Sequence, residues 1–429
     1  MIKRILHHFA ARVLTAGLSF VVVWLTARYL GAAGRGQVSL FVTDVAALVL
    51  FIGLVGGSSL IYLVPGRNLW LLLRPAYSWA VVVSGIGALL VGLLRPVGAA
   101  YVGHLAAVTL VQAWFSVNTF LLLGRQRERA FNGLMTLQTL LLAGALALAF
   151  GPAEWREVPV FYYANYLAFG LPLLISLALL RRLPDAWASR RRRRRAVARE
   201  LARHSRGAHF SNILSFANYR LGYYAVAYFA DARALGILSV GVALAEAIWL
   251  IPRSTALIQY VALVNARDKQ EQTYAALRGS RLTLLATAAA VLVLAAVPAS
   301  WLAAVFGPEF GGAQAVIWCL APGILINGAG MQASTYFGGV ARYGVNNRAS
   351  LLGLLVTVPA CLLLVPRLGI LGAALGMSAA YAASVGYLFW HYRRATGATW
   401  ADLLPGWADV RWVLEALRQM SRPETKGRV

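Results

Sequence analysis

Apolar runs of about 20 residues recur along almost the whole of this chain. A helix of that length rises about 1.5 Å per residue, so each run can cross the roughly 30 Å hydrocarbon core of a bilayer. The composition agrees, because 60% of the 429 residues are hydrophobic and only 13% are charged. Backbone polar groups inside a bilayer need partners within their own segment. The sequence therefore predicts an all-α integral membrane protein.

The apolar runs predict twelve transmembrane helices. They cover residues 9–30, 37–65, 76–94, 98–123, 131–150, 158–180, 208–230, 235–264, 282–304, 312–340, 348–366 and 369–392. The first run is too long for a signal-peptide core and lacks a small-residue cleavage site before its end, so we expect it to be retained. Cys319 and Cys361 fall inside predicted helices and indicate neither a disulfide framework nor a metal site.

Positive charge falls mainly on one side of these predicted helices. The chain has 40 Lys and Arg residues against 15 Asp and Glu residues. Most of the basic residues lie at the two ends and in alternate loops, and the opposite loops hold Arg28, Arg35, Arg95, Arg156, Arg233 and Arg367. Cytoplasmic loops of membrane proteins carry such an excess. Both termini are therefore predicted to be cytoplasmic.

The longest hydrophilic segment divides the predicted helices into two groups of six. It contains an unbroken arginine run at 190–195, which favours a cytoplasmic position and attraction to anionic lipid headgroups. No aromatic residues interleave the arginines, so nucleic acid is not expected as a partner. The predicted domains are an N-terminal six-helix bundle (1–182), a basic cytoplasmic linker (183–207), a C-terminal six-helix bundle (208–394) and a cytoplasmic tail (395–429).

The tail contains "WADVRWVLEALRQM" at 407–420, where apolar residues recur at helical spacing. This pattern predicts an amphipathic helix at the membrane interface or against a partner. A poorly ordered end without a role is the alternative.

The two predicted bundles resemble each other in sequence. When "YLGAAGRGQVSLFV" (29–42) is laid over "FADARALGILSVGV" (229–242), Gly36 and Ser39 fall on Gly236 and Ser239. Two copies of six helices keep the same orientation, related by an axis along the membrane normal. We therefore expect two pseudo-symmetric six-helix bundles around a central cavity.

Arg220 lies near the middle of a predicted membrane helix, in "NYRLGYYAVAYF" (218–229). An arginine at such a position costs about 2.5–3.5 kcal/mol, so a lipid-facing orientation is unfavourable. Glu246 is predicted at a similar depth in the next helix, where it can pair with Arg220, and Arg253 follows Glu246 by two turns. Such pairs either fix helix packing or belong to a cavity that binds an anion. The guanidinium fork suits phosphate because it donates to two oxygens at once.

The sequence offers candidates for both roles in a transport cavity. The predicted cavity and substrate-binding residues are Arg12, Arg28, Arg220, Arg253, Tyr219, Tyr223, Tyr224, Asn118 and Gln332. The predicted gating or ion-coupling residues are Asp44, the acid expected to be buried in the first bundle, and Glu246. Ordinary helix packing is the competing explanation for the tyrosines and amides, and internal charge neutralisation for Asp44.

Several catalytic chemistries have no basis in the sequence. A P-loop needs a lysine in a glycine-rich loop before Ser or Thr, and none of the chain's lysines, Lys3, Lys269 and Lys426, is so flanked. No His or Cys cluster has the spacing of a metal site. We therefore expect an ATP-independent transporter without cofactor, not an enzyme.

Four stretches give the chain a family resemblance. They are "ARYLGAAGRGQVSLFVT", "NYRLGYYAVAYFADARALGILSVGVALAEAIWLIP", "FGPEFGGAQAVIWCLAPGILI" and "LLVPRLGILGAALGMSAAYAASV". Over residues 1–392 the chain resembles the bacterial O-antigen and exopolysaccharide flippases of the multidrug/oligosaccharidyl-lipid/polysaccharide exporter superfamily. Arg220 matches the arginine of that family's Arg-x-Asp element, although Gly222 stands where the acid is usual.

The resemblance implies a multi-pass protein of the bacterial inner membrane that flips an undecaprenyl-diphosphate-linked oligosaccharide to the periplasmic leaflet by alternating access. The lipid bilayer and that glycolipid are then its partners, with the polysaccharide polymerase and chain-length machinery as further ones. Two other classes stay open. An ion-coupled small-molecule exporter of the multidrug type would place an acid in the first helix, and residues 9–30 hold none. An oligosaccharide polymerase or ligase would need a large periplasmic loop, which the predicted spans do not leave.

Overall fold

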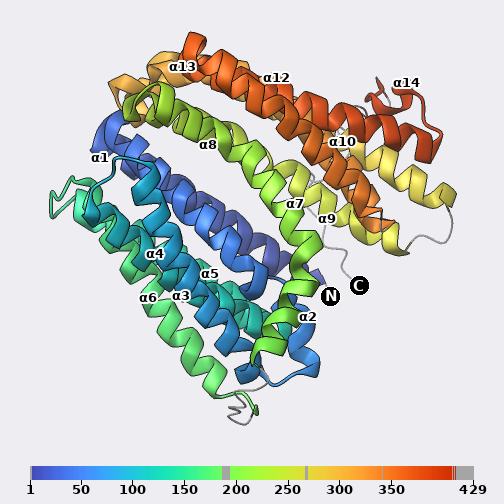
Figure 1. Cartoon of the computed structure of the whole chain (residues 1–429). Helices are drawn as coiled ribbons and strands as arrows, with labels where there is room; N and C mark the ends of the chain where they lie inside the picture. Colours follow the sequence, from blue (N-terminus) through green and yellow to red (C-terminus); the bar gives the residue numbers. More distant parts are fainter. Residues whose placement is uncertain are drawn as a thin grey trace, which may run out of the picture. The chain divides into compact units, whose positions relative to one another are not determined.

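The computed structural model describes residues 2–185, 194–265, 269–340, 342–407, 409 and 411, with only the backbone described at 2–12, 194–195, 207–208, 257–258, 260–265, 269–276, 278, 400 and 403. Within these ranges every regular element is a helix (Figure 1). The elements are α1 (Ile2–Gly56), α2 (Ser59–Leu63), η1 (Val64–Gly66), α3 (Leu69–Leu94), α4 (Ala99–Gly124), α5 (Glu128–Phe150), α6 (Val158–Arg181), α7 (Arg194–Phe229), α8 (Ala232–Ala247), α9 (Leu250–Asn265), α10 (Lys269–Ala295), α11 (Ala299–Phe306), η3 (Pro308–Gly312), α12 (Ala313–Gly339), α13 (Tyr343–Thr396) and α14 (Trp400–Leu403).

Many of these helices have the length and composition of membrane spans. Among the described residues eight qualify, or nine if Gly279–Ala295 and Ala299–Phe306, bent by 80°, form one span. The prediction of an all-α, multi-pass membrane protein is therefore confirmed. Two of the eight, Val13–Gly66 and Tyr343–Thr396, each contain 54 residues. At about 1.5 Å per residue, a straight helix of that length would far exceed the bilayer core.

Single glycines break both of these long helices. Gly31 has φ 67° and ψ −176°, and Gly369 has φ 55° and ψ −130°. Residues with a side chain avoid this backbone region, which glycine enters freely. The sequence predicts separate helices at 9–30 and 37–65, joined by a loop. The structure corrects this expectation, because the helix resumes directly after Gly31 and includes Arg35.

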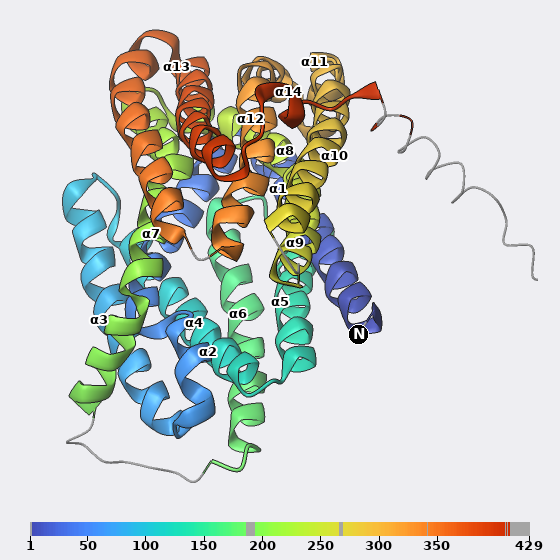
Figure 2. The ribbon, with the colours of Figure 1, turned by 90° about the vertical axis from the view of Figure 1, so that its right-hand side faces the viewer.

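The chain forms two compact units. The first comprises residues 1–240 together with 300–312, and the second comprises 241–299 and 313–429. In the first unit α1 packs against α3, α4, α5 and α7, while α6 packs against α4 and α5 (Figures 1 and 2). One apolar core of this unit includes Phe41, Leu105, Leu146 and Phe150, all at most 1% exposed. In the second unit α12 packs against α9, α10 and α13.

A close backbone contact in the first unit joins the two stretches that match in sequence. A Cβ atom built on Gly36 would lie 1.7 Å from the carbonyl oxygen of Ala232. One built on Gly236 would lie 1.9 Å from the carbonyl oxygen of Ala32. Small residues let helix backbones approach this closely. The contact is reciprocal, since each glycine faces the residue four positions before the other one.

The segment 300–312 binds both helical stretches near this contact through Glu309. Glu309 accepts a hydrogen bond from the backbone nitrogen of Ala32 at 2.8 Å, directly after the break at Gly31. Its other carboxylate oxygen lies 2.8 Å from Nε of Arg233. A carboxylate is favourable at a helix start, where backbone N–H groups lack partners. Glu309 therefore supports the beginning of both matching helical stretches.

Alanine at Gly36 or Gly236 is expected to destabilise the protein. The added Cβ overlaps backbone atoms that cannot rotate away, and such overpacking costs about 1–3 kcal/mol or more. The midpoint of thermal unfolding of the detergent-solubilised protein measures the effect. Gly144→Ala is the matched control, because a Cβ at this helical glycine meets no atom within 4 Å. An unchanged midpoint for Gly36→Ala would show that the two backbones are not in contact.

Candidate functional site

Two arginines of the first unit share one tyrosine. The Arg220 guanidinium carbon lies 5.1 Å from the centre of the Tyr223 ring, and its Nη1 donates to the carbonyl oxygen of Tyr219 at 3.3 Å. Tyr223 is buried and also interacts electrostatically with Arg35 on α1. An arginine over an aromatic face gains cation–π attraction, which grows when water is excluded. Tyr223 thus lies under the Arg220 guanidinium on α7, the helix that packs against α1 with Arg35.

Arg35 is a buried cation held by neutral groups. It is 8% exposed, and its Nε donates to the Ser239 hydroxyl at 3.1 Å while Nη1 donates to the Thr26 hydroxyl at 2.9 Å. Among the described residues no carboxylate lies within ion-pair distance of Arg35. Thr26 precedes the break at Gly31 and Arg35 follows it, so this side chain also braces the bend in α1. Hydroxyls satisfy its donors but leave its charge uncompensated.

Asp44 follows Arg35 on the same segment of α1 and has three partners. The carboxylate, 2% exposed, forms an ion pair with Arg95 and accepts hydrogen bonds from Tyr101 at 2.5 Å and Tyr224 at 3.0 Å. Arg95 is the C-cap of α3, and Tyr101 and Tyr224 belong to α4 and α7. One carboxylate therefore ties four parts of the unit together. Asp44 is buried, as expected from the sequence.

The two groups differ in how their charges are compensated. Asp44 neutralises Arg95, whereas the hydrogen-bond partners of Arg35 are neutral hydroxyls. Adjacent positions on α7, Tyr223 and Tyr224, reach the Arg35 group and the Asp44 group respectively. A buried guanidinium among apolar helices attracts an anion, and guanidinium groups bind phosphate oxygens in pairs.

The other predicted residues of the first unit lie apart from this cluster or serve packing. Asn118 is fully buried, donates to the Ser176 hydroxyl at 2.9 Å and accepts from the Tyr77 hydroxyl at 2.8 Å. It links α3, α4 and α6, as the packing alternative expects. Arg28 is exposed, and its Nη1 lies 3.5 Å from the carbonyl oxygen of Ala304. The side chain of Arg12 lies outside the described part of the structure.

Three predicted residues fall in the second unit. Arg253 on α9 is exposed, with its guanidinium carbon 6.0 Å from the centre of the Trp249 ring. Gln332 on α12 is fully buried and donates to the carbonyl oxygen of Pro252 at 3.0 Å and to the Thr255 hydroxyl at 2.8 Å. Glu246 on α8 is half-buried. Its pairing with Arg220 would join residues of the two units and stays a prediction.

Sequence reasoning missed Arg35, Arg95 and Tyr101 as site residues. Arg35 and Arg95 were assigned to loops because each lies next to a predicted end of an apolar run. The polar series Arg35, Ser39 and Thr43 was the available signal, since residues four apart share one helix face. Arg95 has the long apolar stem that lets an end-of-helix arginine extend its charge to a buried partner.

Removing the Asp44 carboxylate is expected to leave the Arg95 guanidinium without its ion-pair partner. Breaking a buried ion pair from one side costs about 3–5 kcal/mol, because the remaining charge stays desolvated. Asp44→Asn should therefore lower the thermal midpoint strongly, and Arg95→Gln should recover part of that loss when combined with it. A coupling of about 0.5–3 kcal/mol is expected from the double-mutant cycle.

Glu154 and Arg156 provide the control pair for this cycle. Their side chains are 79% and 50% exposed and lie 4.0 Å apart, so their coupling should stay within about 0–1 kcal/mol. Strictly additive effects at Asp44 and Arg95 would contradict the ion pair.

Comparison with known proteins identifies the architecture. No protein-family model matches the sequence, and no curated protein matches it either. Among solved structures, an inward-facing MATE family multidrug resistance transporter of the MOP superfamily has a TM-score of 0.70 at 13% identity, covering 89% of this chain and 95% of that one. The lipid II flippase MurJ, in an inward closed conformation, has a TM-score of 0.69 at 11% identity, covering 99% and 94%.

A MOP superfamily transporter from Pyrococcus furiosus has a TM-score of 0.61 at 15% identity, covering 92% of this chain and 97% of that one. These matches extend over nearly the full length of each protein, so they concern the whole arrangement of helices. The chain thus has the fold of the MOP superfamily transporters.

Proposed function

We propose that this protein is a flippase for an undecaprenyl-diphosphate-linked oligosaccharide in the bacterial inner membrane. It would carry the repeat unit to the periplasmic leaflet by ATP-independent alternating access, for the biosynthesis of O-antigen or exopolysaccharide. The observation that carries the proposal is the buried Arg35, whose hydrogen-bond partners are neutral hydroxyls, on the helix that packs against the helix of Arg220. A diphosphate needs positive charge where water is scarce, and guanidinium groups meet its oxygens with matched donors.

The proposal includes a topology of twelve crossings. The breaks at Gly31 and Gly369 let α1 and α13 each cross twice. With α3, α4, α5, α6, α7, α8 with α9, α10 and α12, this gives twelve crossings in two bundles with both termini in the cytoplasm. The sequence match between residues 29–42 and 229–242 supports two related bundles. A cavity between the bundles is part of the proposal.

Asp44 and Glu246 are proposed as gating or ion-coupling residues. The three partners of Asp44 belong to α3, α4 and α7, so a change in its charge would loosen several helices at once. Moving one charge through about 100 mV is worth about 2.3 kcal/mol, enough to bias an alternating cycle. Arg12, Arg28 and Arg253 are proposed to extend the positive lining, with polymerase and chain-length proteins as partners in the membrane.

The alternative function is an ion-coupled small-molecule exporter of the multidrug type. The similarity to the MATE family transporter favours it as much as the similarity to MurJ favours a flippase, since the TM-scores are 0.70 and 0.69. A cationic drug, however, would be repelled by the arginines of the first unit. Accumulation of a lipid-linked oligosaccharide in the cytoplasmic leaflet of a deletion strain distinguishes the two, because a drug exporter leaves that glycolipid unchanged.

Arg220→Ala is expected to abolish export while the protein still inserts and accumulates. Arg220→Lys should restore part of the activity, because it keeps the charge and loses the fork of donors. Surface polysaccharide of a complemented deletion strain measures export, and immunoblotting of membranes measures insertion. The matched control is Arg156→Ala, which removes a half-exposed guanidinium of the same unit. Wild-type export by Arg220→Ala would remove Arg220 from the mechanism.

A further inference from the structure

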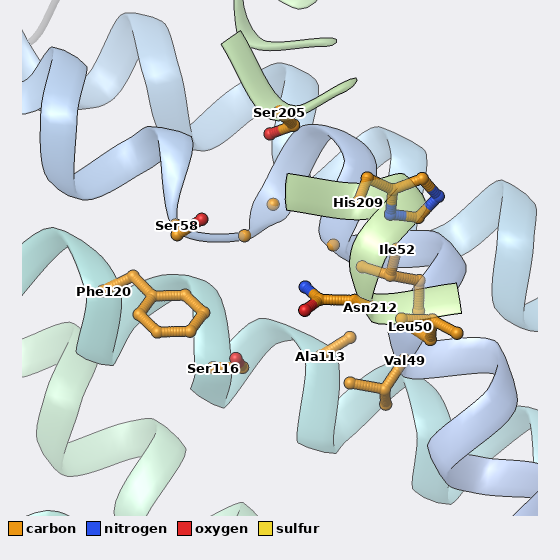
Figure 3. Close-up of a pocket in the computed structure, with 13 residues that line it drawn as sticks. Val49, Leu50, Ile52, Ser58, Ala113, Ser116, Phe120, Ser205, His209 and Asn212 are labelled. Carbon is orange, nitrogen blue, oxygen red and sulfur yellow. The ribbon is translucent and has the colours of Figure 1, made fainter. Parts of the chain in front are cut away.

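A polar cavity lies within the first unit, and none of the arginines described above lines it. It has a volume of about 220 Å³ and is bordered by the end of α1, the middle of α4 and the first half of α7 (Figure 3). Drug-sized pockets usually measure roughly 300–1,000 Å³, so this cavity has room for one small ring or a few waters. Ser58 and Asn212 at its border are exposed, which makes it accessible from the surface.

Five polar side chains line this cavity. They are Ser58, Ser116, Ser205, His209 and Asn212. The Ser205 hydroxyl is buried and has no hydrogen-bond partner within the described part of the chain, and the His209 ring contacts the ring of Phe51. Figure 3 shows the Asn212 amide pointing into the space bordered by Phe120, Ser58 and Ser116. Buried polar groups are usually paired, so the Ser205 hydroxyl indicates a polar occupant.

The lining also defines the charge of that occupant. None of the thirteen residues around the cavity is Asp, Glu, Lys or Arg. An ionised group would therefore enter without a compensating charge, which is costly in a weakly polar surrounding. Hydroxyl, amide and imidazole groups both donate and accept, and this mixed capacity matches a ligand whose own groups do both.

The apolar part of the lining completes the match to a sugar. Phe120 contributes an aromatic ring from α4, across the space from Asn212 of α7 (Figure 3). The hydroxyl groups of a pyranose lie around its rim and its C–H groups form an apolar face, so one ring can meet hydroxyls at its edge and an aromatic ring below. Gly53 of α1 adds no side chain to the cavity, and a Cβ built on it meets no atom within 4 Å, so the space remains open.

We propose that this cavity is a binding site for one neutral sugar ring. This inference rests on the proposed flippase function and topology, which place the cavity at the cytoplasmic end of the first bundle. There it would hold an uncharged sugar of the headgroup while the diphosphate meets the arginines. The substrate class is thereby narrowed to oligosaccharides that carry at least one uncharged pyranose.

Saturation-transfer NMR on the full-length protein in nanodiscs tests the site, with free glucose, galactose and N-acetylglucosamine as probes. Glucuronate is the charged control. At least one neutral sugar should receive saturation, and glucuronate should bind about tenfold more weakly or worse, a difference of about 1.4 kcal/mol. Absence of binding by all three neutral sugars, or stronger binding by glucuronate, would overturn the proposal.

Gly53→Leu fills the cavity, because a Cβ on Gly53 meets no atom within 4 Å. It should weaken sugar binding by about tenfold or more. Gly144→Leu is its matched control, an exposed helical glycine with equal space, and should bind as the wild type does. The double variant Ser116→Ala with Ser205→Ala removes two donors without adding volume and should weaken binding even if Gly53→Leu does not fold. Unchanged binding in the folded variants would refute the site.

Arg220→Ala separates the two proposals. It should bind the free neutral sugars within about twofold of the wild type, because no arginine lines the cavity. Wild-type export by Arg220→Ala would remove Arg220 from the proposed flippase mechanism, whereas loss of sugar binding in Arg220→Ala would refute an independent sugar site.

Discussion

The desolvation of guanidinium groups among apolar helices is the constraint on which the first unit depends. An arginine at the centre of a membrane helix costs about 2.5–3.5 kcal/mol, so it is kept only where its donors are satisfied or its charge is used. Arg35 has two hydroxyls and a tyrosine as neighbours, and Arg95 has the buried carboxylate of Asp44. The tyrosines of α7 serve both groups, since Tyr223 lies under the Arg220 guanidinium and Tyr224 donates to Asp44.

The break at Gly31 makes this arrangement possible. Because the helix resumes at once, Arg35 faces inward only one turn after the bend and reaches back to Thr26 before it. Glu309 supports the new helix start, and the contact between Gly36 and Ala232 brings α8 close enough for Ser239 to reach Arg35. The positions of these side chains therefore follow from backbone geometry that only glycine provides at residues 31 and 36.

Hydropathy predicted the fold class and the approximate position of most helices, because a bilayer requires long apolar segments whatever their partners are. The match between residues 29–42 and 229–242 also led to a real contact at Gly36 and Gly236. The roles of single side chains were harder to predict. Asn118 and Gln332 have the amides expected of a sugar site, yet each is buried in contacts between helices. Asp44 was predictable as a buried acid, but its partner Arg95 was not, because sequence spacing does not reveal how far a side chain extends beyond a helix end.

The division of the chain between the two units has a consequence for how each unit is assembled. The polypeptide passes from one unit to the other at residues 240/241, 299/300 and 312/313, so it crosses between them three times. The first crossing lies inside α8, and the other two border a segment of thirteen residues in which Glu309 binds the backbone of Ala32. The first unit is therefore incomplete until residues 300–312 have been added to it, about 60 residues after its main segment ends.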